Sequence, residues 1–128
     1  MPIDTSAAIL VTSGVDLDRW LSAHAAERRE VVVAIFNKAS GRQTVNLSGL
    51  QEVAACHGWV DTQIKRINDE RYAIRFVPRR PGSNWTEGNR AVARRLLAEG
   101  RLTPAGIASL PDDLQAAGSG QADPSRSS

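Results

Sequence analysis

The stretch WVDTQIKRINDERYAIRFV, residues 59–77, decides the fold. Strand-forming residues lie on both sides of a polar group at 68–70, which is typical of a β-hairpin turn. Apolar residues then alternate along the second half, so they share one face and Arg75 points to the other. The residues on that shared face are Tyr72, Ile74 and Phe76. The stretch predicts two antiparallel strands, over 59–67 and 71–77.

The residues before the hairpin predict two helices and one central strand. VVVAIF, residues 31–36, is apolar and β-branched without interruption, as expected of a strand buried on both faces. Asp16 is predicted to cap the first helix. Ser48 and Gln51 have the spacing of a capping box for the second helix, which Gly58 would end.

The residues after the hairpin predict a pair of helices and a tail. Asn84, with a glutamate three residues later, predicts the start of a helix that ends at Gly100. Thr103, followed by proline, predicts a second, short helix that Pro111 stops. The remaining residues, 112–128, are polar and lack periodicity, so a disordered tail is predicted there.

Together these elements predict the α+β class. We expect one domain over residues 1–111, with a small, mainly antiparallel sheet, a hairpin at about 59–77 packed against helices, and a C-terminal helical pair. The length of 128 residues, with 41% hydrophobic and 23% charged residues, is typical of a single globular domain.

The composition excludes several classes of protein. The N-terminal residues MPIDTSAAILVTSGV hold only a short apolar run, which predicts neither a signal peptide nor a membrane span. Cys56 is the single cysteine, so an internal disulfide is excluded, and no metal or other cofactor is predicted. Its neighbour His57 points about 100° away on a helix, which disfavours a nucleophile–base pair. A cytoplasmic, non-enzymatic protein is expected.

Basic residues concentrate in one part of the chain. Residues 75–101 hold seven arginines and two glutamates, whereas the whole chain has a net charge of only +2. Arg75, Arg79 and Arg80 precede a predicted helix start, where exposed amides favour anions, so they could form an anion cradle. The alternative is structural, with one arginine paired to Asp61 across the hairpin and the others solvated.

The neighbouring polar and aromatic residues have the same two interpretations. Ser83, Asn84, Thr86 and Asn89 are suited to capping and turn formation. Trp85 is either a core residue or a platform on which a ligand stacks. The predicted ligand-binding set is Asp61, Arg75, Arg79, Arg80, Ser83, Trp85 and Asn89.

A third group of arginines lies on one predicted helical face. Arg90, Arg94 and Arg95 follow the spacing i, i+4 and i+5. Such a face could contact nucleic-acid phosphates, or it could simply be solvated. A nucleic-acid-binding protein is therefore the alternative function.

Three segments in fixed order carry a family resemblance: GWVD at 58–61, RYAIRFVPRRPGSNW at 71–85 and LLAEGRLTPAG at 96–106. Over residues 53–108 the chain closely resembles the YdeI/OmpD-associated, or bacteriocin-protection, family. It departs mildly from the family pattern, with Thr86 in place of serine and Leu102 in place of methionine.

The resemblance implies a bacterial stress or antimicrobial-resistance role, without an agreed enzymatic activity or cofactor. It names no ligand, so an unidentified small molecule or protein is the expected partner. Because antimicrobial peptides are usually cationic, an arginine-rich patch would repel them. An anionic or aromatic ligand near residues 75–90 is therefore expected.

Overall fold

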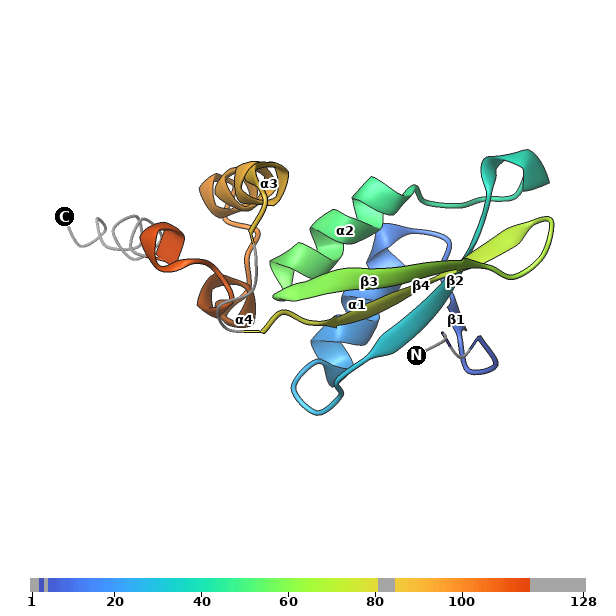
Figure 1. Cartoon of the computed structure of the whole chain (residues 1–128), viewed down its shortest axis with the longest axis horizontal. Helices are drawn as coiled ribbons and strands as arrows, with labels where there is room; N and C mark the ends of the chain where they lie inside the picture. Colours follow the sequence, from blue (N-terminus) through green and yellow to red (C-terminus); the bar gives the residue numbers. More distant parts are fainter. Residues whose placement is uncertain (1–2, 4, 81–84, 116–128) are drawn as a thin grey trace.

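The computed structural model describes residues 3, 5–80 and 85–115. These residues form four strands and five helices, which confirms the α+β class (Figure 1). In chain order the elements are β1 (Ile9–Leu10), α1 (Gly14–His24), β2 (Val31–Phe36), the 3₁₀ helix η1 (Lys38–Ser40), α2 (Leu47–Cys56), β3 (Trp59–Arg66), β4 (Arg71–Pro78), α3 (Glu87–Ala98) and α4 (Pro104–Ala108). None of the helices in the described part is long and apolar enough to cross a membrane.

The four strands form one mixed sheet in the order β1-β2-β4-β3. β1 runs parallel to β2, whereas β4 pairs antiparallel with both β2 and β3. The predicted hairpin is confirmed: Asn68 turns the chain by accepting hydrogen bonds from the backbone N–H groups of Glu70 and Arg71. A bulge between Asp61 and Gln63 interrupts the register of β3.

Helices α1 and α2 cover one face of the sheet and form the main core with it. The apolar residues of the predicted hairpin face point into this core, and Ile74 and Phe76 are fully buried. Leu17 and Leu21 of α1 and Leu50 of α2 pack against them. The core members are Val11, Leu17, Leu21, Val31, Val33, Ile35, Leu50, Ala54, Trp59, Ile74 and Phe76.

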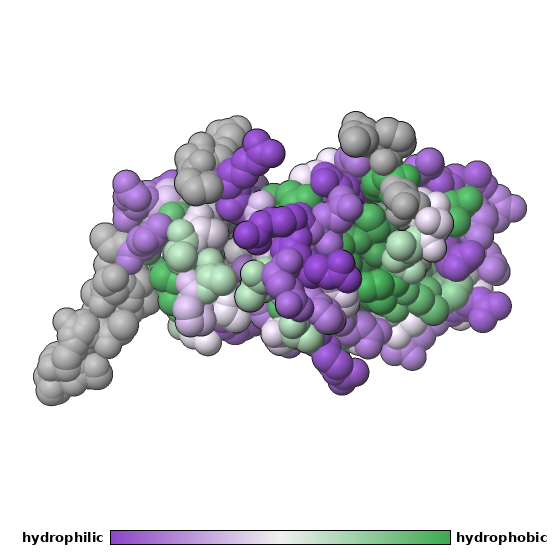
Figure 2. Space-filling view, turned by 90° about the horizontal axis from the view of Figure 1, so that it is seen from below, coloured by the Kyte–Doolittle hydropathy of each residue, from purple (hydrophilic) through white to green (hydrophobic). Residues whose placement is uncertain are grey.

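The other face of the sheet carries a smaller cluster. Ile3, Val32 and Ala73 are buried there. β2 thus contributes side chains to both clusters, as its continuous apolar sequence predicted. Ile9 and Leu10 of the edge strand remain exposed, and Figure 2 shows apolar surface in the half of the molecule that holds the sheet.

The predicted caps of α1 and α2 are each misplaced by two or three residues. The N-cap of α1 is Ser13, and Asp16 lies inside the first turn, where its carboxylate accepts hydrogen bonds from the backbone N–H and hydroxyl of Thr12. The N-cap of α2 is Asn46, which accepts from the backbone N–H of Gly49 at 2.8 Å. Ser48 lies within that first turn and donates to Asn46 instead.

The C-terminal helices lie past the end of the sheet where β3 begins and β4 ends (Figure 1). α3 begins later than predicted, because its N-cap is Thr86, whose hydroxyl accepts from the backbone N–H of Asn89. Asn84, the predicted cap, lies outside the described residues. The cap of α4 is Thr103, as predicted.

Ordered packing continues beyond the predicted domain boundary at residue 111. Residues 112–115 are helical, and Leu114 is 5% exposed within a third cluster that contains Ala93 and Leu110. The prediction of disorder from residue 112 is therefore wrong for these four residues, because the apolar Leu114 finds a partner on α3. The rest of the predicted tail, 116–128, lies outside the described residues.

Candidate ligand-binding hollow

A hollow of about 600 Å³ opens between the end of α1, the ends of the hairpin and α4. Its walls are mostly apolar, and Leu21, Trp59 and Pro104 are examples. Arg29 and Arg79 supply the formal charges, since none of the described residues that line the hollow is an aspartate or glutamate. The full lining is Leu21, Ser22, Ala25, Ala26, Arg29, His57, Gly58, Trp59, Pro78, Arg79, Thr103, Pro104, Ala105, Ala108 and Ser109.

Two glycines allow α4 to form one wall of this hollow. A Cβ on Gly106 would lie 2.9 Å from the carbonyl carbon of Cys56, and closer still to its oxygen. Gly58 has a φ of 78°, and a Cβ there would lie 2.8 Å from the carbonyl oxygen of Ala105. Thr103 fixes the approach, because its N–H and its hydroxyl both donate to the Cys56 carbonyl at 2.9 Å. Close backbone packing therefore sets the shape of the hollow.

Arg79 is the best-anchored cation of the hollow. Its backbone N–H donates to the carbonyl of Gly58 at 2.8 Å, which extends the hairpin pairing by one residue. Its guanidinium lies over the ring of Trp85, 4.0 Å from the centroid. Burial lowers the pKa of Arg79, and the nearby Asp61 carboxylate opposes that shift. The group stays charged at neutral pH, since a guanidinium is effectively always protonated in proteins.

A smaller cavity of about 30 Å³ lies beside the hollow. Trp59, Trp85 and Asn89 line it, together with apolar residues from several elements, among them Ala93 of α3 and Leu110 after α4. Arg79 lines both spaces, as do Gly58, Trp59 and Ser109. The structure therefore brings three of the predicted ligand-binding residues, Arg79, Trp85 and Asn89, to one place.

Arg75 and Asp61, two other predicted members of the ligand-binding set, contact other groups. Arg75 projects from the opposite face of the sheet, where its Nε donates to Glu30 at 2.5 Å and its Nη1 donates to Thr62. The predicted cradle of three arginines is therefore wrong for Arg75, because strand alternation turns it away from the helices. Asp61 accepts from Gln51 at 3.2 Å.

Of the two remaining predicted residues, the structure describes only Arg80. Arg80 is exposed and does not line the hollow. Ser83 lies outside the described residues.

His57 forms a polar contact between α1 and the end of α2. Its ring is only 7% exposed, and Nε2 lies 2.8 Å from Oδ1 of Asp18. The adjacent Cys56 is buried, and burial raises the pKa of its thiol. A raised pKa lowers the thiolate fraction, so this environment does not activate Cys56 as a nucleophile.

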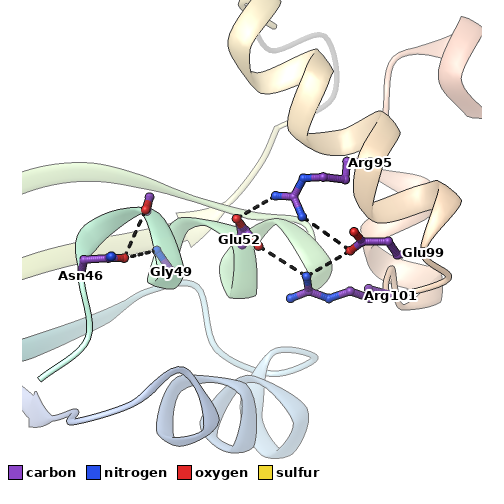
Figure 3. A network of polar contacts seen from close by, with 7 residues as sticks. Asn46, Gly49, Glu52, Arg95, Glu99 and Arg101 are labelled. Atoms are coloured by element: carbon purple, nitrogen blue, oxygen red, sulfur yellow. Dashed lines mark hydrogen bonds and ion pairs between the residues drawn. The ribbon is translucent and has the colours of Figure 1, made fainter.

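The arginines of α3 each lie beside a carboxylate. Arg90 contacts Asp113 at 2.5 Å, and Arg94 lies 3.9 Å from Glu87. Arg95 contacts Glu52 of α2 at 2.7 Å, and Glu52 also contacts Arg101 (Figure 3). Because neighbouring carboxylates offset these positive charges, the helix face attracts phosphate less than its sequence suggests.

Sequence reasoning missed Arg29 as a residue of the hollow. It follows α1 in the polar run ERRE, where nothing in the local pattern distinguishes it from a solvated residue. Only the folded chain brings it to the same hollow as Arg79, which is fifty positions later. The sequence also gave no signal that His57, which follows α2 directly, would contact Asp18 of α1.

Comparison with known proteins places the chain in a family. No curated protein and no solved structure matches it. Residues 9–109, from β1 to the end of α4, match a family described as "Domain of unknown function (DUF8412)". The resemblance to the YdeI/OmpD-associated family remains a prediction. Because the match covers well over half of its length, the chain belongs to the DUF8412 family.

Proposed function

We propose that this protein is a non-enzymatic binding protein that holds a small organic anion in the hollow between α1, the hairpin and α4. The observation that carries the proposal is the charge of the lining: Arg29 and Arg79 lie among apolar walls without a carboxylate among the described lining residues. The apolar walls favour a ligand with an apolar body. The arginines favour a carboxylate or a similar anionic group.

The size of the hollow fits this class of ligand. About 600 Å³ lies within the usual range of sites for small organic molecules, roughly 300–1,000 Å³. Such sites combine mostly apolar walls with a few polar groups that fix the orientation of the ligand. Ser22 provides a hydroxyl group of this kind, whereas the hydroxyls of Thr103 and Ser109 already donate to backbone carbonyls.

The family resemblance suggests the biological setting of this binding. A bacterial protein of antimicrobial-resistance type could sequester a harmful compound, and the arginines make an anionic or aromatic compound the first class to test. The same charges disfavour cationic peptides.

Nucleic-acid binding through Arg90, Arg94 and Arg95 is a weaker candidate. Their carboxylate neighbours would have to be displaced or repelled by each phosphate contact. The two candidates differ in salt dependence, because affinity for nucleic acid falls steeply with added salt. A ligand held mainly by apolar walls responds much less.

Calorimetric titration with two matched probes tests the proposal. 2-Naphthoate and 2-naphthylmethylammonium share one ring system but carry opposite charges. We expect the anion to bind and the cation to bind at least about tenfold more weakly, since each charge-assisted contact contributes roughly 1.5–3 kcal/mol. Equal affinity for the two probes, or binding of neither, would overturn the proposal.

A matched pair of variants locates the binding. Arg29→Gln removes a charge from the hollow, whereas Arg42→Gln removes one beside Phe36, outside the hollow. We expect Arg29→Gln to weaken 2-naphthoate binding by roughly tenfold and Arg42→Gln to leave it unchanged. An equal effect of both variants would mean that only the overall charge matters.

A further inference from the structure

The two arginines of the hollow differ in their surroundings. Arg29 is exposed in the loop between α1 and β2, where its Nη1 makes a weak contact of 3.5 Å with the carbonyl oxygen of Arg28. Arg79 is half-buried, and the central carbon of its guanidinium lies 4.0 Å from the centroid of the Trp85 ring, in a cation–π contact. The two cations are therefore suited to different contacts with one ligand.

We infer that Arg79 is a stacking platform that selects planar aromatic ligands, while Arg29 contacts their anionic group. This inference rests on the proposed function and narrows its ligand class to aromatic organic anions. A guanidinium is planar and has two faces, and both can stack on π systems. The Arg79 guanidinium lies over the Trp85 ring, and Arg79 also lines the hollow. An aromatic ring in the hollow that stacks on the opposite face of the guanidinium would place Arg79 between Trp85 and the ligand.

The stacked geometry does not require new hydrogen bonds from Arg79. Face stacking does not involve the N–H groups, because they lie in the guanidinium plane. Asp61 is near enough to influence the pKa of Arg79, and it can keep doing so while a ring lies on the guanidinium face. The anionic group of the ligand is then left to Arg29, whose side chain extends from a different element.

The packing around Trp85 supports a rigid platform. Trp85 packs against the cluster of Ala93, Leu110 and Leu114, which holds the indole between α3 and the residues that follow α4. The backbone of Arg79 is held by Gly58. A platform with both partners anchored loses little conformational freedom when a ligand stacks on it.

Two probes of equal charge and the same carbon connectivity test the inference. 2-Naphthoate and decahydro-2-naphthoate share the carboxylate and the carbon skeleton, but only the first has π faces. The saturated probe buries at least as much apolar surface, so hydrophobic burial alone favours it or gives no preference. We expect the wild-type protein to bind 2-naphthoate roughly three- to tenfold more tightly, because guanidinium–π stacking adds to burial.

Substitutions then assign the preference to one residue. Arg79→Lys keeps the charge but replaces the planar group, so we expect the aromatic preference to vanish. Arg29→Lys should keep that preference, because a lysine still meets the carboxylate. Circular dichroism and thermal unfolding establish that both variants are folded. The comparison of the two probes on the wild-type protein tests stacking even if a variant fails to fold.

The possible results separate the inference from the proposed function. If the saturated probe binds the wild-type protein as tightly as 2-naphthoate, stacking is refuted while anion binding stands. If neither probe binds, the proposed function fails and this inference fails with it. A folded Arg79→Lys variant with its full aromatic preference would refute Arg79 as the platform.

Discussion

Replacing Gly106 with alanine tests whether close backbone packing builds the hollow. The new Cβ would meet the Cys56 carbonyl, with its carbon at 2.9 Å and its oxygen closer, and the next nearest atom would be the Ala55 carbonyl oxygen at 3.3 Å. These are backbone atoms, so no flexible side chain can move aside. α4 would have to shift away from α2 and lose its two hydrogen bonds from Thr103 to Cys56.

The expected cost combines three effects. Overpacking costs about 1–3 kcal/mol, and the two hydrogen bonds contribute about 1 kcal/mol each. The higher helix propensity of alanine offsets about 1 kcal/mol of this loss of stability. Gly106→Ala should therefore lower the free energy of unfolding by about 2–4 kcal/mol, which corresponds to a fall in Tm of roughly 8–15 °C.

Gly88→Ala is the matched control in α3. A Cβ there would meet only the Thr86 hydroxyl, at 4.0 Å, so we expect an unchanged or slightly higher Tm. Urea unfolding followed by circular dichroism measures both variants. If Gly106→Ala is as stable as Gly88→Ala, the close approach of α4 to α2 is wrong.

Three further substitutions test the local contacts. Because Asn46 caps α2, Asn46→Ala should lower the free energy of unfolding by about 1 kcal/mol, and Ser48→Ala by less than about 0.5 kcal/mol. Urea unfolding measures both variants, and a larger loss for Ser48→Ala would support Ser48 as the cap instead. Thr103→Val removes the hydroxyl and should lower the free energy of unfolding by about 1–3 kcal/mol. Thr103→Ser keeps the hydroxyl and should cost much less. Equal losses for the two variants would mean that the methyl group of Thr103 matters and its hydroxyl does not. Hydrogen bonding from the Thr12 backbone N–H lowers the pKa of Asp16 in the folded protein. The ionised Asp16 carboxylate therefore stabilises the fold above its unfolded-state pKa, and this stabilisation is lost as the pH falls through its folded-state pKa. The stability difference between wild type and Asp16→Asn should thus be constant above about pH 5 and shrink in acid, and a pH-independent difference in Tm would contradict this.

The sequence predicted the elements whose signals are local. The alternation of residues 71–77 and the turn at 68–70 define the hairpin, and the uninterrupted apolar run at 31–36 defines a strand buried on both sides. Thr103 was identified as a cap because proline follows it directly, and the structure agrees. In each case the decisive residues lie within a few positions of one another.

The errors in helix starts have a physical reason. Asn46 and Ser48 can both accept a hydrogen bond from a first-turn amide, so propensity alone does not choose between them. In the structure Asn46 has an extended backbone, with φ −80° and ψ 165°, and accepts from the N–H of Gly49, whereas Ser48 already lies inside the helix. The spacing of Ser48 and Gln51 therefore did not by itself define the start of α2.

The places of the candidate site residues depend on contacts between distant parts of the chain, which the local sequence does not predict. Arg75 pairs with Glu30, forty-five positions away, and His57 contacts Asp18, thirty-nine positions away. Arg29 reaches the hollow only because α1 ends beside the hairpin. Side-chain type and spacing carry no information about such pairings, so the predicted set of arginines held only one residue of the hollow, Arg79.

The central claim is that the hollow between α1, the hairpin and α4 is the binding site. Backbone amide NMR shifts during titration with 2-naphthoate test it most directly. We predict shifts around the end of α1, Gly58, Arg79 and α4, and unchanged shifts for Arg90 and Arg94 on α3. Shifts confined to α3, or no shifts at millimolar probe, would contradict the claim.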